Sequence, residues 1–296
     1  MKLADVLSVA REELKYFRMR YLVLSDRRYL RKRFKQRLGR ELNLANPTLY
    51  NDKLQWLKLH WHDPLAPSLV DKYSVREYVS EKIGEEFLNN LIAVYDRPEE
   101  IDFDRLPDSF VLKATHGSGW NIICCDKAVL DRQLARKKLR RWLRRNAYAN
   151  GRSWVYKNIK PRIVCEEYLQ DRKTGDLRDY KIFCFSGRPF LIQVDFSRFV
   201  NHRRNLYSPS WDLMTAQFQY PSSPNVELEK PPQLQDMLSL AAQLAEPFPH
   251  CRVDFYIVDE RIIFGELTFF PESGFGRFHP QQMEVELGAA LTLPGN

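Results

Sequence analysis

The chain has 296 residues, of which 44% are hydrophobic and 13% aromatic, and its formal net charge is +8 at pH 7. This composition excludes an intrinsically disordered protein and leaves room for one large domain or two modest ones. The five cysteines lack C-x-x-C spacing, which excludes the common zinc modules and predicts reduced core thiols. No apolar run approaches the roughly 18 residues of a membrane span, so a cytoplasmic protein is expected.

The positive charge is concentrated in two segments. Residues 27–40 carry eight Lys or Arg, and residues 136–145 carry seven. Such segments suit nucleic acid, anionic lipid headgroups or an acidic polymer. No zinc finger, RNP motif or other nucleic-acid module accompanies them, so no nucleic-acid partner is expected. For 136–145, a solvated helix face is the alternative.

Helices and strands follow one another in an order typical of an α+β protein rather than a doubly wound sheet. Apolar residues at helical spacing predict one long helix over residues 1–38. Its basic second half suits a membrane surface, and packing on the main domain is the alternative. Further helices are predicted at 69–88, 131–146 and 232–246. Strands are predicted at 92–95, 110–113, 121–125, 162–166, 179–185 and 190–196, followed by a hairpin at 251–268. The polar, proline-punctuated residues 198–230 predict a long functional loop.

The hairpin at 251–268 places acidic side chains together. Because side chains alternate along a strand, Arg252 and Asp254 share one face, as do Glu266 and Thr268. A three-residue connection would put Asp254 opposite Glu266. Two facing carboxylates repel each other unless positive charge lies between them, and Mg²⁺ shared with substrate phosphates is the natural candidate. The alternative is a surface hairpin whose acids point into water.

A lysine and a glycine turn lie between two predicted strands. Lys113 ends the first strand and is followed by the loop His116, Gly117, Ser118 and Gly119. Glycines let backbone N–H groups approach an anion closely, so this loop is a candidate phosphate cover. It is neither a Walker A loop nor a G-x-G-x-x-G fingerprint, and an ordinary hairpin is the alternative.

Two more lysines are candidates for anion binding. Asp179 and Lys181 share one face of a predicted strand, and an inward-pointing lysine needs either a salt bridge or a phosphate. Lys72 opens a predicted helix, where a solvated lysine is the alternative. Three lysines, a glycine loop and two facing carboxylates together fit MgATP better than any one of them does.

The order of these pieces resembles the ATP-grasp superfamily, and specifically the TupA-like ATP-grasp family associated with bacterial surface polysaccharides. The segments that carry the resemblance are LVDKYSVREYV, LPDSFVLKATHGSGWNII, PRIVCEEYLQ, LRDYKIFCFSGRP and RVDFYIVDERIIFGELTFFPESGFGRF, between residues 69 and 278. The resemblance implies an ATP-grasp fold, with two α+β subdomains sandwiching ATP. It assigns 1–62 to a basic helical N-terminal region, 63–170 to a subdomain with the phosphate loop and adenine hinge, and 171–296 to a subdomain with the metal site.

The resemblance also implies nucleotide contacts. Lys72 and Lys113 look like the ATP-phosphate lysines, with the loop from His116 to Gly119 over the phosphates. The hinge at 165–169 looks like the adenine site. The residues that complete the expected nucleotide site are the backbones of Glu167 and Leu169, Glu166 toward the base, Asp179 toward the ribose or phosphates, and Lys181 at the triphosphate.

At the metal end, Asp254 and Glu266 look like the Mg²⁺ ligands, and Arg252 looks like the cation for the transferring phosphoryl group. Many ATP-grasp ligases have Asn as a third metal ligand where this chain has Thr268. A hydroxyl is a weaker ligand than an amide carbonyl, so Glu272, Ser273 or a water would complete a second metal position.

The implied function is an ATP- and Mg²⁺-dependent carboxylate–amine ligase that decorates a surface polysaccharide or its precursor. An acidic glycan or lipid-linked precursor and an amino acid are the expected substrates, and the basic segments suit contact with the anionic inner face of a membrane. Two alternatives remain: a kinase that phosphorylates a sugar hydroxyl, and a non-catalytic glycan- or membrane-binding protein.

Overall fold

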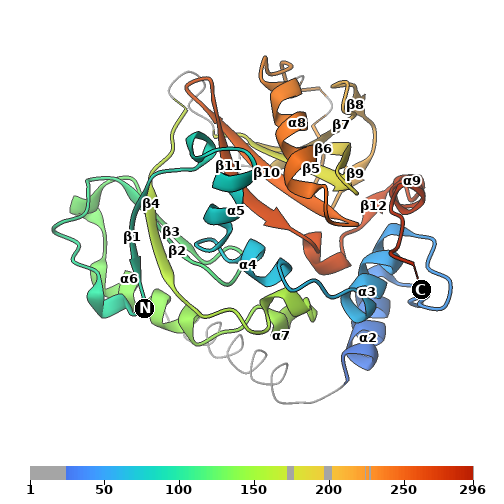
Figure 1. Ribbon diagram of the computed structural model, residues 1–296, viewed down its shortest axis with the longest axis horizontal. Coiled ribbons are helices and arrows are strands. Elements are labelled where there is room, and N and C mark those ends of the chain that lie inside the picture. The colour runs from blue at the N-terminus through green and yellow to red at the C-terminus, as the bar shows by residue number, and fades with distance from the viewer. Residues whose placement is uncertain (1–24, 172–176, 197–201, 224, 227, 296) are drawn as a thin grey trace.

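The computed structural model describes residues 25–171, 177–196, 202–223, 225–226 and 228–295. It contains two large antiparallel sheets and a small two-stranded one, with helices packed around them, which confirms the α+β prediction (Figure 1). The described helices are α2 (Asp26–Leu38), α3 (Tyr50–His60), α4 (Ala66–Val70), α5 (Val75–Lys82), α6 (Arg132–Leu143), α7 (Tyr148–Gly151), α8 (Leu234–Ala245) and α9 (Gln282–Ala290). The predicted helix at 1–38 is therefore seen only as α2, and its first part lies outside the described residues.

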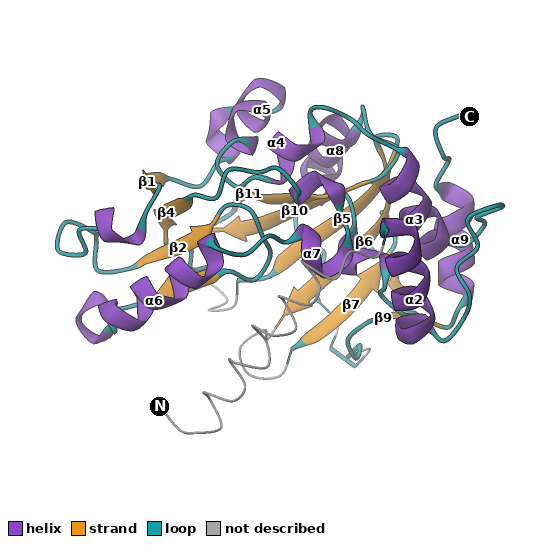
Figure 2. Ribbon diagram, turned by 90° about the horizontal axis from the view of Figure 1, so that it is seen from below, coloured by secondary structure: helices purple, strands orange, loops and turns teal. Residues whose placement is uncertain are grey.

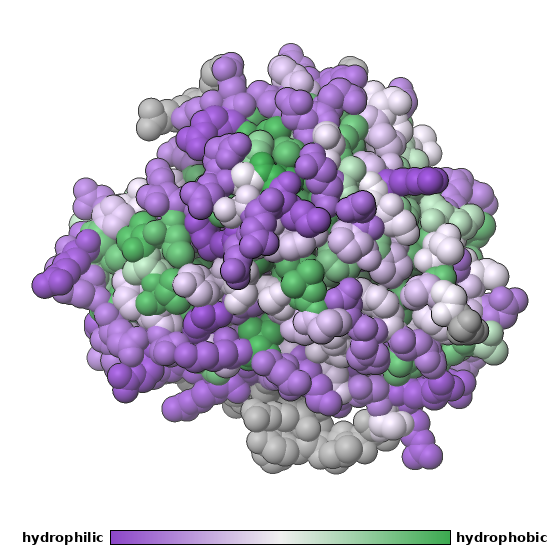
Figure 3. All heavy atoms as spheres, in the orientation of Figure 1, coloured by the Kyte–Doolittle hydropathy of each residue, from purple (hydrophilic) through white to green (hydrophobic). Residues whose placement is uncertain are grey.

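The smaller sheet has the strand order β1-β4-β2-β3. Its strands are β1 (Leu91–Tyr95), β2 (Phe110–Ala114), β3 (Asn121–Cys124) and β4 (Ile163–Glu167). Helix α6 lies along this sheet and buries Ala135 and Leu139 against it (Figure 2). At the sheet edge, all residues of β1 are half-buried, and hydrophobic residues gather over this part of the molecule (Figure 3).

The larger sheet has the order β11-β10-β5-β6-β7-β8. Its strands are β5 (Asp179–Phe185), β6 (Arg188–Phe196), β7 (Arg203–Tyr207), β8 (Leu213–Met214), β10 (Cys251–Val258) and β11 (Arg261–Thr268). A two-stranded sheet of β9 (Gln217–Phe218) and β12 (Phe278–His279) lies beside it. Helix α8 covers one face of the larger sheet at β5, β6 and β10, while α2, α3 and α9 lie together at one end (Figure 2).

Two predicted elements were wrong. The expected loop at 198–230 contains β7, β8 and β9, because Leu206 and Tyr207 are buried in the core while the polar Asn205 is buried with hydrogen bonds to Ser223 and Val226. The alternation of apolar and polar residues that would mark β7 as a strand is absent from the sequence, because Arg204 and Asn205 are polar yet buried.

The expected helix at 69–88 is broken between α4 and α5. Asp71 accepts hydrogen bonds from the N–H groups of Tyr73 and Ser74, which stabilises a turn instead of a helix.

The β10–β11 hairpin has the predicted pairing near the active site, but a different connection produces it. The connection has two residues, Asp259 and Glu260, both with positive φ of 47° and 70°, as a type I′ turn requires. Asp254 nevertheless pairs with Glu266, as predicted, because a bulge at Gly265 shifts the register by one residue. A Cβ at Gly265 would lie 3.1 Å from the Asp254 carbonyl oxygen, so the bulge favours glycine.

All five cysteines are free thiols and four are buried, which agrees with the expectation of reduced core cysteines. Among the described residues, no helix has the length and apolar character needed to cross a membrane.

Candidate active site

Three adjoining cavities form a groove between the two sheets. The hinge cavity, about 910 Å³, is lined by residues that include Glu167 and Leu169. A central cavity of about 20 Å³ adjoins it and is lined by Lys72, Lys113 and Glu166. The charged cavity, about 700 Å³, shares Lys72 and Lys113 with the central one. The groove therefore runs from the predicted adenine hinge to the predicted metal site.

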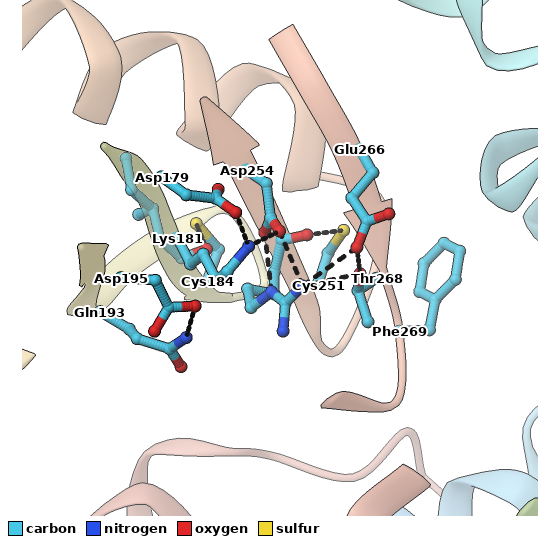
Figure 4. Close-up of polar contacts among 12 residues, drawn as sticks. Asp179, Lys181, Cys184, Gln193, Asp195, Cys251, Asp254, Glu266, Thr268 and Phe269 are labelled. Atoms are coloured by element: carbon cyan, nitrogen blue, oxygen red, sulfur yellow. Dashed lines mark hydrogen bonds and ion pairs between the residues drawn. The ribbon is translucent and has the colours of Figure 1, made fainter. Parts of the chain in front are cut away.

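Adjacent strands bring the predicted catalytic side chains together in the charged cavity. In the sheet register Asp254 of β10 pairs with Lys181 of β5 on one side and with Glu266 of β11 on the other. Because residues two apart share a face, Asp179 and Thr268 lie on the same face (Figure 4). We call Asp179, Lys181, Arg252, Asp254, Glu266 and Thr268 the charged cluster.

Arginine and lysine side chains hold the two facing carboxylates. The Arg252 guanidinium donates to both oxygens of Asp254 at 2.7 Å and to Glu266 at 3.2 Å. Lys181 donates to Asp179 at 2.6 Å and to Asp254 at 2.5 Å (Figure 4). Positive charge does lie between the carboxylates, as the sequence requires, but here it is the guanidinium of Arg252.

Neighbouring charges shift the pKa values of Glu266 and Lys181 in the direction that favours their ionised forms. Burial alone would raise the pKa of Glu266, but Lys72, Arg252 and Lys181 outweigh it and hold that pKa well below the ordinary value. Burial alone would lower the pKa of Lys181, but Asp179 and Asp254 outweigh it and raise it. The folded protein therefore places alternating fixed charges along one wall of the groove.

Asp254 and Glu266 fit a Mg²⁺ site in which the metal replaces the lysine and arginine side chains that now contact them. Among the described residues, no group of three or more His, Cys, Asp or Glu is already arranged around a metal position. Mg²⁺ needs only one or two carboxylates when phosphates supply other ligands. Glu266 is the accessible one, since its side chain is 32% exposed and that of Asp254 only 2%. Lys72, 3.2 Å from Glu266, would have to move to a phosphate first.

Thr268 connects Arg252 with Glu266. Its hydroxyl accepts from Arg252 at 3.2 Å and donates to Glu266 at 3.1 Å. A role as metal ligand stays a prediction, and the contact made here is that of a group orienting the carboxylate.

The phosphate-loop lysines are fixed by neighbouring elements. Lys113 of β2 donates to Glu166 of β4 at 2.6 Å, so the predicted phosphate lysine and the predicted adenine-side acid form an ion pair. The backbone N–H of Lys72 donates to the carbonyl of Thr115 at 3.1 Å. This hydrogen bond ties the break between α4 and α5 to the start of the glycine loop.

The glycine loop is anchored at one end and open at the other. The buried His116 ring contacts the carbonyl oxygens of Trp142 and Arg145 through Nε2, at 3.2 and 3.1 Å, at the end of α6. A Cβ at Gly117 would lie 2.4 Å from the Trp120 ring, so Trp120 packs where only glycine leaves room. Ser118 and Gly119 line the charged cavity, whereas the His116 ring is turned toward α6.

The hinge differs in detail from the expectation. The backbone N–H of Glu167 donates to the carbonyl of Asn90, and its carbonyl accepts from the Asn89 side chain, each at 3.0 Å. Its N–H is therefore engaged within the protein, while its carbonyl oxygen keeps a second lone pair for a ligand.

A family model described as TupA-like ATPgrasp matches residues 52–292. The chain belongs to the TupA-like ATP-grasp family. This confirms the resemblance read from the sequence and the ATP-grasp fold with it. A search of curated proteins found no match.

Three solved structures are similar to this chain, each with low sequence identity and a TM-score below 0.5. The ligase PsnB complexed with a phosphomimetic precursor variant, Mg and ADP has a TM-score of 0.44 and 10% identity, covering 81% of this chain and 65% of that one. D-alanine–D-alanine ligase from Bacillus anthracis complexed with ATP has a TM-score of 0.41 and 15% identity, and the match covers 68% of this chain and 55% of that one. N5-carboxyaminoimidazole synthase from Aspergillus clavatus has a TM-score of 0.39 and 11% identity, and the match covers 68% of this chain and 44% of that one. The chain thus spans about half to two thirds of their lengths, and the fold assignment rests on the family model.

This TupA-like protein has cavity residues that the sequence did not single out. Asp195 and Arg204 form a buried pair, with Arg204 Nε 2.6 Å from Oδ1 and Nη2 3.2 Å from Oδ2. Arg33 and Arg37 of α2 also line the charged cavity. Arg204 was missed because β7 was taken for loop. The alternation Gln193, Val194, Asp195 on a predicted strand was the available signal for Asp195.

Proposed function

We propose that the chain is an ATP- and Mg²⁺-dependent carboxylate–amine ligase. The observation that carries the proposal is the charged cluster on three adjacent strands, which opens into a groove lined by Lys72 and Lys113. In this arrangement, adenine occupies the hinge cavity and the phosphates run through the central cavity. The γ-phosphate then lies beside Lys181 and Arg252 in the charged cavity.

The residues of the cluster have complementary tasks. Bound Mg²⁺ neutralises phosphate charge and orients the γ-phosphate for in-line transfer. Asp254 and Glu266 hold the metal, while Lys72, released from Glu266, and Lys113 bind phosphate oxygens. Arg252 and Lys181 stabilise the negative charge that develops on the transferring group. Before Mg²⁺ binds, the side chains of Arg252 and Lys181 are held in place by Asp254 and Asp179.

The reaction proceeds in two steps. A carboxylate oxygen of the substrate bonds to the γ-phosphorus as the bond to ADP breaks, giving an acyl phosphate. The lone pair of an amine then attacks the acyl carbon, phosphate leaves, and the amine loses a proton, giving an amide. Closing the glycine loop over the groove excludes water that would hydrolyse the acyl phosphate.

The proposed substrates are a bacterial surface polysaccharide or its lipid-linked precursor and an amino acid. The family assignment and the basic segment at 27–40 support this choice. In that segment, the structure fixes Arg40 in ion pairs with Asp52 and Glu284 and leaves Arg33 and Arg37 at the cavity. The segment at 136–145 belongs mostly to α6, which packs on the smaller sheet. In it, Arg136 donates to the carbonyls of Pro98 and Ile101, and Arg140 pairs with Glu99.

Trapping of the acyl phosphate tests this proposal. The protein is incubated with MgATP, hydroxylamine and a panel of uronic acids and amino acids, and hydroxamate and ADP are measured. We expect equal amounts of both with at least one acid, because hydroxylamine replaces the amine. ADP formation together with a stable sugar phosphate would instead identify a kinase. No ADP with any member of the panel, and no stabilisation by MgATP, would leave only the binding-protein alternative.

A further inference from the structure

A strained turn borders the charged cavity, which Glu272 and Ser273 help to line. In the 3₁₀ turn η5 (Pro271–Gly274), Glu272 and Ser273 have left-handed φ angles of 48° and 54°. This conformation costs about 1–2 kcal/mol for each residue that is not glycine. It persists only where neighbouring groups hold the turn, and such strain clusters at functional sites.

Two side chains of α3 hold this turn. Gln55 donates to the carbonyls of Ser273 at 3.1 Å and Gly274 at 2.7 Å. Lys58 donates to the carbonyls of Ser273 at 2.6 Å and Gly151 at 2.7 Å. A buried lysine committed to two carbonyl oxygens fixes the backbone firmly, so the orientation of Glu272 is set by the fold.

Glu272 is the accessible, weakly paired carboxylate among the described residues of the cavity. Its side chain is 32% exposed, and its nearest ion-pair contact is Arg204 at 3.7 Å, which is already bidentate on Asp195. The other cavity acids differ: those of Asp179, Asp195 and Asp254 are each 2% exposed, and Glu266 is held by two cations. Glu272 is therefore suited to bind a positively charged group that enters the cavity.

Unpaired positive charge lies on the neighbouring helix. Arg33 and Arg37 are one turn apart on α2 and line the same cavity. In the described part of the chain, neither guanidinium has an ion-pair or hydrogen-bond partner. Helix α2 is packed on the chain that follows η5 through Phe34 and Phe275, whose ring centroids are 6.4 Å apart. The cavity lining thus includes a carboxylate and two guanidinium groups, which come from two neighbouring segments that pack together through Phe34 and Phe275.

Building on the ligase function and the amino-acid substrate proposed above, we infer that Glu272, Arg33 and Arg37 form the site that binds this amino acid in the charged cavity, through its α-ammonium and α-carboxylate groups. Glu272 accepts hydrogen bonds from its ammonium group, and Arg33 and Arg37 bind its carboxylate. A polyamine would be repelled by the arginines, and a dicarboxylate without an amine would be repelled by Glu272. A zwitterion satisfies both charges.

The test is binding of amino acids in the presence of Mg²⁺ and a non-hydrolysable ATP analogue, measured by calorimetry. Each L-amino acid is compared with its methyl ester, which lacks the carboxylate, and its N-acetyl derivative, which lacks the ammonium. We expect at least one free amino acid to bind, and both derivatives to bind at least about tenfold more weakly. Glu272→Gln should lose the preference for the free amine over the N-acetyl form. Arg33→Gln with Arg37→Gln should lose the preference for the acid over the ester.

The matched control is Arg31→Gln with Lys32→Gln, which removes the same charge from exposed positions of α2 outside the cavity and should leave both preferences intact. Three results would overturn the inference: preferences unchanged in the cavity variants, no amino acid bound while the nucleotide binds, or Mg²⁺-dependent nucleotide binding lost in Glu272→Gln, which would assign Glu272 to the metal. Failure of the wild type to bind the nucleotide would instead contradict the proposed ligase itself.

Discussion

Glu266→Gln is expected to lower ATP turnover by about 10²–10³-fold and to remove the Mg²⁺ dependence of nucleotide binding. The amide keeps the shape of the side chain but loses the charge that would hold the metal. Because the Glu266 side chain is partly exposed and Arg252 keeps its two hydrogen bonds to Asp254, the variant should lose less stability than Asp254→Asn. The measurement is thermal stabilisation by ATP with and without Mg²⁺, followed by ADP release.

Asp254→Asn is the companion variant, and it should be less stable than Glu266→Gln. It leaves the buried cations of Arg252 and Lys181 without their main anion, which costs about 3–5 kcal/mol of unfolding free energy. ATP-dependent stabilisation should vanish in the double variant of Asp254 and Glu266. Full Mg²⁺-dependent stabilisation in that double variant would show that the metal lies elsewhere.

Asp195→Asn is expected to lower the free energy of unfolding by about 3–5 kcal/mol at pH 7, since it strands the buried Arg204 guanidinium. Burial alone would raise the pKa of Asp195, but Arg204, Lys181 and His202 outweigh it and lower it from 3.8 to about 2. The folded-state pKa lies below the ordinary value, so this stabilisation is present above about pH 4 and fades as the pH falls toward 2. The shift corresponds to about 2 kcal/mol.

Urea unfolding of both proteins between pH 7 and pH 3 measures this effect. The gap between wild type and variant should narrow at the acidic end. Asp195→Asn with Arg204→Met is the matched control, because removing both charges leaves neither one stranded, and part of the stability should return. A constant gap across the pH range, or a double variant no more stable than the single one, would contradict the assigned ion pair.

The positions of several candidate site residues relative to one another could be predicted from local sequence signals, while their roles stay predictions. Asp179, Lys181, Asp254 and Glu266 lie on strands whose two-residue alternation fixes which side chains share a face. The pairing of Asp254 with Glu266 was predicted through the wrong connection, because a two-residue turn and a bulge at Gly265 give the same register as a longer turn.

Two turns that shape the site were not predicted. Helical periodicity continued through Asp71 and Lys72, and only the carboxylate of Asp71 bonding to the following N–H groups breaks the helix there. That break places Lys72 against the charged cluster. The left-handed turn at Glu272 depends on Lys58, which is more than two hundred residues away in the sequence. The sequence around Glu272 therefore gives no sign of the lysine that holds its turn.

The transfer of oxygen tests the central claim most directly. The acids of the hydroxylamine panel are labelled with ¹⁸O in the carboxyl group and incubated with MgATP and amino acids, and the released phosphate is analysed by mass spectrometry. The ligase mechanism predicts one ¹⁸O atom in each phosphate formed, because the carboxylate oxygen that attacked phosphorus leaves with it. Unlabelled phosphate, or label kept wholly in a phosphorylated sugar, would contradict an acyl phosphate and with it the proposed function.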